Sequence, residues 1–104
     1  MATSVGSIDL RRIVETKSRA FVLFSGEWCP DCREFEPIWS AWAKNRAADC
    51  YQVEVPRGGP EWSDWDLEEI PTVAAFLDGR EVQRVHGIIT REDLDALAAR
   101  RGLR

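Results

Sequence analysis

Residues 20–32 read AFVLFSGEWCPDC, and this stretch sets the fold class. Its first part, Ala20 to Ser25, is a continuous apolar run, which is typical of a strand covered by helices on both faces. After the cysteines, apolar residues recur at helical spacing: Phe35, Ile38, Trp39 and Trp42. The sequence therefore predicts a central strand that leads through a short loop into a helix opened by the C-x-x-C motif.

The flanking sequence supplies the other elements of the domain. Upstream, Ser7 is expected to cap a short helix with an apolar side formed by Ile8, Leu10, Ile13 and Val14. Downstream, we expect a strand over residues 51–55 and one or two helical turns within residues 61–69. Residues 72–77 and 81–85 read as a β-hairpin around the Asp78-Gly79 turn.

The last element is a helix with a capping signature. Thr90 and Asp93 can satisfy the free amides at its start, and we expect it to fray near Gly102. A chain of 104 residues closes one core, so residues 1–104 are predicted to form a single domain. Its class is α/β, with a mixed sheet of four or five strands flanked by helices.

Composition argues against two classes of function. The chain has 14 Lys plus Arg against 18 Asp plus Glu, a net charge of -4. Nucleic-acid affinity depends on neutralising phosphates, so no nucleic-acid partner is expected. The longest apolar run, Ala20 to Phe24, is far below the roughly 20 residues of a membrane-spanning helix. The chain as given begins with no export signal, and we expect a cytoplasmic protein, a monomer in the simplest case.

Cys29 and Cys32 carry the chemistry. A C-x-x-C pair in a reducing compartment indicates redox or metal chemistry. A thiol attacks a disulfide as the thiolate, and the open amides and positive dipole of a helix N-terminus stabilise that charge. Cys29 stands at this N-terminus, and Cys32 lies one turn inside. We therefore predict that Cys29 is the nucleophile and that Cys32 resolves the mixed disulfide.

Pro30 and Asp31 lie between the cysteines and are expected to tune the pair. Pro30 suits the first helical turn and stiffens the loop. The Asp31 carboxylate competes with the Cys29 thiolate for the same positive potential, so it should make the couple more reducing. We expect a reduction potential of roughly -200 to -270 mV.

These residues resemble the thioredoxin family over nearly the whole chain. The resemblance rests on Trp28-Cys29-Pro30-Asp31-Cys32, Arg33, Pro37, Ile70-Pro71-Thr72, Gly79 and Gly87. The W-C-P-D-C version is similar to small cytosolic thioredoxin-related disulfide reductases. The resemblance implies a three-layer thioredoxin-like fold and a protein-disulfide reductase without a cofactor. It would take electrons from a thioredoxin reductase-type donor and pass them to protein or small-molecule disulfides.

The resemblance also implies roles for other residues. Pro71 would be cis and face the cysteines, and the Ile70 backbone would pair with an extended substrate segment. Trp28 would lie on the rim of the site, where its ring can contact substrate. Two positions depart from the family, because Leu23 replaces a buried acid and Gln52 replaces a lysine on the next strand. Either Asp31 then accepts a proton through water, or Cys32 deprotonates slowly.

Other interpretations stay open at this point. The proline directly after Cys29 also suits a glutaredoxin-like enzyme that uses glutathione, although no basic glutathione clamp is evident. A non-catalytic or metal-binding module is the third class, with Cys29, Cys32, Cys50 and His86 as conceivable zinc ligands. We expect no metal, because Cys50 and His86 are far apart in sequence. Trp62 and Trp65 either pack the short helix or widen an aromatic surface near the cysteines.

Overall fold

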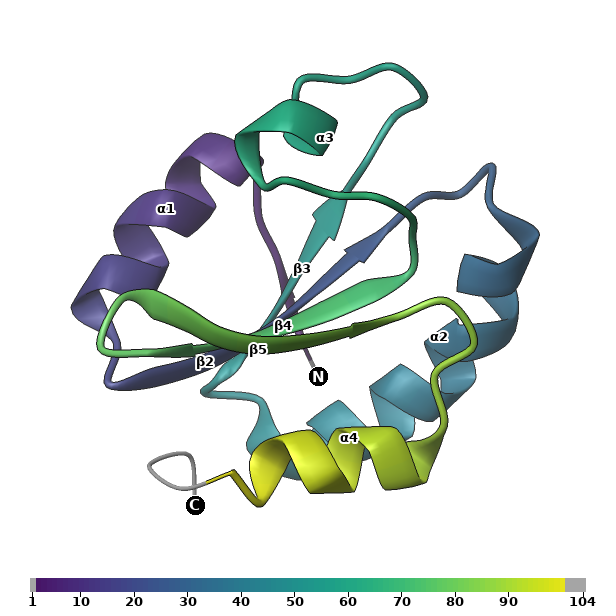
Figure 1. The fold of residues 1–104 in the computed structure, drawn as a ribbon. Helices are drawn as coiled ribbons and strands as arrows, with labels where there is room; N and C mark the ends of the chain where they lie inside the picture. The colour runs from purple at the N-terminus through teal and green to yellow at the C-terminus, as the bar shows by residue number, and fades with distance from the viewer. Residues whose placement is uncertain (1, 101–104) are drawn as a thin grey trace.

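The computed structural model describes residues 2–100, and within them a five-stranded mixed sheet forms the centre of the molecule (Figure 1). The strand order is β1-β3-β2-β4-β5. The strands are β1 (Thr3–Ser4), β2 (Arg19–Ser25), β3 (Cys50–Glu54), β4 (Thr72–Leu77) and β5 (Arg80–His86). β1, β3 and β2 are parallel, whereas β4 is antiparallel to both β2 and β5. The predicted mixed sheet with the apolar run as its central strand is confirmed.

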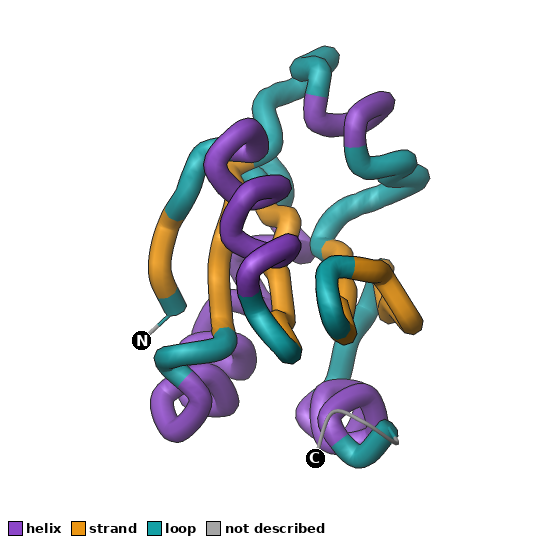
Figure 2. The backbone as a smooth tube through the Cα atoms, turned by 90° about the vertical axis from the view of Figure 1, so that its left-hand side faces the viewer, coloured by secondary structure: helices purple, strands orange, loops and turns teal. Residues whose placement is uncertain are grey.

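Helices cover both faces of this sheet. They are α1 (Ser7–Thr16), α2 (Pro30–Ala43), α3 (Glu61–Asp64) and α4 (Arg91–Ala98), with a short 3-10 turn η1 (Lys44–Arg46) after α2. α1 and α3 lie on one face and α2 and α4 on the other, which gives three layers (Figures 1 and 2). The α/β class and the three-layer arrangement agree with the prediction.

The two layers of core explain why residues 20–24 of β2 are all apolar. Ala20, Val22 and Phe24 pack with α1, whereas Phe21 and Leu23 pack with α2 and α4. Successive residues of a strand point to opposite faces, so a strand covered on both sides has no position for a polar side chain that faces water. On the α2 side, the Phe21 and Trp42 rings meet edge to face with centroids 5.2 Å apart.

Local signals predicted the hairpin and the last helix correctly. Asp78 and Gly79 both have positive φ (51° and 84°), as a two-residue hairpin turn requires. The Thr90 side chain accepts from Asp93 N–H, and the Asp93 side chain accepts from Thr90 N–H, which completes the capping box of α4. The expected fraying near Gly102 lies outside the described residues.

Several details differ from the prediction. Gly6, not Ser7, is the N-cap of α1, and Ser7 is its first residue. Ile8 is 84% exposed, because only the turn-spaced Leu10 and Val14 of this helix reach the core. Ile38 in α2 is also exposed, and α3 is a single turn. β1 and η1 were not predicted, since two or three residues are too short to show a periodic pattern.

The fold brings the C-terminal ends of β2 and β3 to the N-terminus of α2, and the loop before β4 to the same end (Figure 1). Within residues 2–100, no helix combines the length and the apolar character needed to cross a bilayer.

Candidate active site

Cys29 is the N-cap of α2. Its backbone is extended (φ -96°, ψ 112°), and its Sγ accepts a hydrogen bond from the backbone N–H of Cys32 at 3.2 Å. An oxygen of Ser, Thr, Asp or Asn usually accepts this bond, and here a sulfur takes the place. Pro30 is the first helical residue and has no N–H to leave unpaired. The free amide and the helix dipole therefore favour negative charge on Cys29 Sγ.

Cys32 is fully buried one turn inside the helix. Burial raises the pKa of its thiol to about 12, and the hydrogen bond and charge of Cys29 act in the same direction. The backbone of Gly26 and the side chain of Ser25 act in the opposite direction. At neutral pH Cys32 therefore keeps its proton. Cys29, Cys32 and Cys50 are all free thiols, so the pair is in the dithiol form.

The loop before β4 forms one wall of the site. The Ile70-Pro71 peptide bond is cis, as the resemblance implied. Cys29 Sγ donates to the carbonyl oxygen of Ile70 at 3.6 Å, although 41 residues separate the two in sequence. Gly87 N–H donates to the Pro71 carbonyl at 3.1 Å, which ties this loop to the end of β5. The structure thus brings Ile70 and Pro71 to the cysteines.

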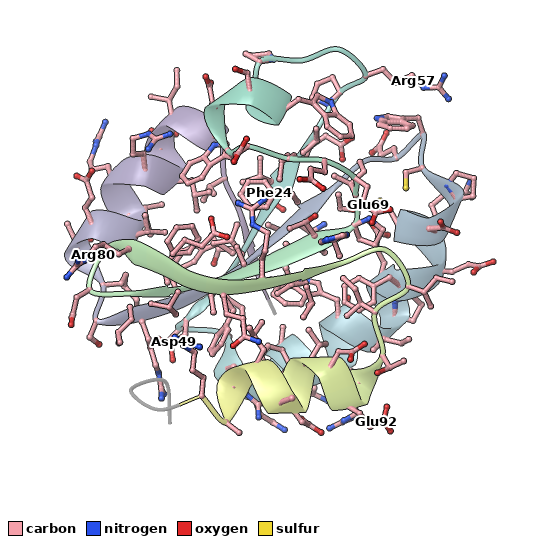
Figure 3. The ribbon with its side chains drawn as sticks, in the orientation of Figure 1. Phe24, Asp49, Arg57, Glu69, Arg80 and Glu92 are labelled. Atoms are coloured by element: carbon pink, nitrogen blue, oxygen red, sulfur yellow. The ribbon has the colours of Figure 1, made fainter. Side chains whose placement is uncertain are left out.

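Trp28 lies on the rim of the site. The residue is 36% exposed, and its Nε1–H donates to the Val55 carbonyl at 2.8 Å. A Cβ on Gly26 would lie 2.6 Å from this Nε1, so the absence of a side chain at Gly26 makes room for the indole. The Arg57 guanidinium lies 4.8 Å from the centre of the Trp28 ring, and Figure 3 shows Arg57 on the loop between β3 and α3.

The other two tryptophans in question have different positions. Trp65 is buried in the core with Phe24 and Phe76, so its packing role is confirmed. Trp62 is half-buried, and its ring centre lies 6.4 Å from that of Trp28. Trp62 therefore contributes both to packing and to the aromatic rim beside the cysteines.

Asp31 is exposed on the outer side of α2. It lines a shallow pocket together with Glu34, Phe35, Ile38, Gly87, Ile88 and Ile89. Its carboxylate is in the first turn of α2, where it interacts favourably with the helix dipole.

The two positions that depart from the family lie side by side on neighbouring parallel strands. Leu23 on β2 pairs with Gln52 on β3, and Leu23 is fully buried among apolar side chains. No carboxylate takes the place of the buried acid at position 23. In contrast, sequence reasoning overlooked Ser25, the last residue of β2, and Gly26, which follows it, and both lower the pKa of Cys32. A serine at the end of an otherwise apolar run was the available signal.

The four conceivable zinc ligands are not brought together. Cys50 is the first residue of β3 and packs in the α2 and α4 layer, whereas Cys29 and Cys32 pack with the other layer. His86 is paired with Glu69 at the end of β5. Within residues 2–100, no three His, Cys, Asp or Glu side chains are arranged to hold a metal ion.

A three-layer α/β fold with a dithiol at a helix N-terminus, facing a cis-proline loop, defines a thiol–disulfide oxidoreductase. Residues 7–100 match the Thioredoxin family model. The chain is 36% identical over 75 residues to thioredoxin H-type 1 of Nicotiana tabacum, a match that covers 71% of this chain and 60% of that protein. It is 33% identical over 79 residues to the thioredoxin of Chlamydia pneumoniae, covering 71% of this chain and 74% of that one.

The fold is shared with solved structures. Plasmodium falciparum thioredoxin superposes with a TM-score of 0.76 at 18% identity, over 92% of this chain and 95% of that chain. The chain belongs to the thioredoxin family, and it is a protein-disulfide oxidoreductase.

Proposed function

We propose that this protein works as a reductase of protein or small-molecule disulfides, with Cys29 as nucleophile and Cys32 as resolving thiol. The observation that carries the proposal is the bond from Cys32 N–H to Cys29 Sγ at the start of α2. This bond and the helix dipole stabilise a thiolate on Cys29, whereas burial keeps Cys32 protonated. The two sulfurs therefore differ in reactivity as an attacking thiol and a resolving thiol must.

The reaction proceeds by two exchanges. Cys29 thiolate attacks one sulfur of the substrate disulfide, and the other substrate sulfur leaves as a thiolate that takes a proton from water. Cys32 then loses its proton and attacks Cys29 Sγ, which releases the second substrate sulfur. The substrate gains two electrons, and the protein is left with a Cys29–Cys32 disulfide.

The residues around the pair bind and tune. We assign to Trp28, Ile70 and Pro71 the contact with the substrate, because Trp28 is the partly exposed ring at the rim and Ile70 touches Cys29. Pro30 stiffens the first turn, and Asp31 makes the couple more reducing by its negative charge at the same helix end.

The cycle needs a donor that returns the disulfide to the dithiol. We assign this step to a thioredoxin reductase-type enzyme, and we place the protein in the cytoplasm as a monomer. The free thiols of Cys29 and Cys32 support this assignment, since a reducing compartment keeps a dithiol as the resting form.

Insulin reduction coupled to NADPH and a thioredoxin reductase tests the proposal. The wild-type protein should sustain NADPH oxidation, while Cys29→Ser should abolish it and Cys32→Ser should stop after a trapped mixed disulfide. A parallel assay replaces the reductase with glutathione and glutathione reductase. Turnover in this second assay alone would instead support a glutaredoxin-like enzyme, and turnover in neither would support a non-catalytic module.

A further inference from the structure

Ser25 is the last residue of β2, and its hydroxyl is buried without a hydrogen-bond partner. The residue is 1% exposed, and within residues 2–100 its Oγ is one of three buried side-chain polar atoms that lack a partner. The backbone carbonyl of Ser25 accepts from Val55 N–H at 2.7 Å, so the strand end is held in place without the side chain. Burying an unpaired hydroxyl costs free energy, so a role in stability does not explain the side chain.

The strand end that carries this hydroxyl leads directly into the start of α2, where Cys32 is buried (Figure 1). The Ser25 side chain lowers the pKa of the Cys32 thiol, although its hydroxyl makes no hydrogen bond in the dithiol form. A hydroxyl can turn about its own bonds, so it can donate to a thiolate as soon as one forms. Hydrogen bonds to charged groups are stronger than those between neutral groups.

The order of the reaction determines when this bond matters. In the dithiol form, both the hydrogen bond to Cys29 and its charge oppose ionisation of Cys32. Once Cys29 is in a mixed disulfide, its sulfur carries no charge, and these two contributions disappear. Burial still raises the pKa of Cys32. The Gly26 backbone and the Ser25 side chain then lower this pKa without help from a carboxylate, because Leu23 occupies the position of the family's buried acid.

We propose that the Ser25 hydroxyl donates a hydrogen bond to the Cys32 thiolate in the resolving step, and that it stabilises this thiolate in a site without a buried acid. Cys32 gives its proton to solvent, and its thiolate attacks Cys29 Sγ. The bond between Cys29 and the substrate sulfur breaks, and that sulfur leaves as a thiolate that water protonates. Ser25 keeps its own proton throughout. The inference rests on the proposed roles of Cys29 and Cys32.

A single-turnover reaction with excess 5,5′-dithiobis(2-nitrobenzoate) separates the two steps. The first coloured thiolate marks attack by Cys29, and the second marks resolution by Cys32, so Cys32→Ser should release only the first. In Ser25→Ala the first phase should be unchanged, and the second should be about tenfold slower, with its pH midpoint moved upward, because a hydrogen bond to a charged group is lost. Ser25→Thr, which keeps the hydroxyl, should restore the second phase.

Tm distinguishes the proposed role of Ser25 from a purely structural one. Under the proposal, Ser25→Ala removes an unpaired buried hydroxyl, so its Tm should equal or exceed that of the wild type while the second phase is slow. A second phase in Ser25→Ala with the wild-type rate and pH midpoint overturns the role of Ser25 and leaves the proposed function intact. Slowing of both phases together with a lower Tm would indicate a structural role and also overturns the proposed role of Ser25. A wild-type protein that releases no coloured thiolate from Cys29 overturns the proposed function itself.

Discussion

Alkylation of the reduced protein tests whether Cys32 holds its proton and why. Burial is the largest cause that raises the pKa of Cys32 from 9.0 to about 12. Only the thiolate reacts with iodoacetamide, and three pKa units lower the thiolate fraction by about 1,000-fold at about pH 8. Cys32 in the folded protein should therefore react about 1,000-fold more slowly than in the unfolded chain.

The variant Cys29→Ser removes the charge of the neighbouring sulfur and leaves Cys32 buried. Cys32 should then react faster than in the wild type, but still far more slowly than in the unfolded chain, because burial outweighs the contribution of Cys29. Cys50 is the internal control. Its pKa is also about 12, but it packs in the core layer with α2 and α4, on the opposite side of the sheet from the layer that contains Cys29 and Cys32. Its rate should not change.

The measurement is quenched labelling followed by mass spectrometry of the peptides, in folded and in guanidinium-unfolded protein. A wild-type Cys32 that reacts within tenfold of its unfolded rate would show that burial does not raise its pKa by three units. So would a Cys29→Ser variant in which Cys32 reaches the unfolded rate, because burial would then contribute nothing.

Three further predictions concern stability and redox balance. The Cys50 pKa is raised from 9.0 to about 12, so burial of its neutral thiol stabilises the folded state fully below pH 9.0 and progressively less up to about pH 12. In urea unfolding across this window, the free energy of unfolding of the wild type should fall by about 1.4 kcal/mol per pH unit more than that of Cys50→Ala. Parallel curves for the two proteins would contradict this prediction. Asp31→Asn should shift the reduction potential in a glutathione titration to a more positive value, and an unchanged potential removes Asp31 from the tuning role. Gly26→Ala should cost about 1–3 kcal/mol in urea unfolding, since its methyl group would lie 2.9 Å from the Val55 carbonyl and crowd the Trp28 indole; a neutral result would mean that the rim shifts freely.

The replacement of the family's buried acid sets the chemical problem of this site. A carboxylate at position 23 would face a fully apolar environment here, so Leu23 fits the core and an ionised side chain would not. The resolving thiol is then left with uncharged donors, the Gly26 backbone and the Ser25 hydroxyl. In the proposed mechanism, proton release from Cys32 therefore depends on solvent and on the capture of the substrate by Cys29.

The sequence alone determined most features that depend on near neighbours in the chain, although it placed the N-cap of α1 at Ser7 instead of Gly6. Cys29 caps α2 because Pro30 and the following residues form a helix with free amides at its start. The Asp78-Gly79 turn and the Thr90 capping box follow from residues two or three positions apart. Such features were predicted with their roles, since backbone geometry and local hydrogen bonds decide them.

Only the tertiary structure decided which side chains face the core and which distant residues meet. Ile8 belongs to the apolar side of its helix and is nevertheless exposed, because Leu10 and Val14 are the residues of α1 that reach the core. Ile70 reaches Cys29 across 41 residues, and Ser25 acts on the pKa of Cys32 because β2 ends beside the start of α2. Burial and long-range contact are properties of the packed layers, and no local pattern in the chain contains them.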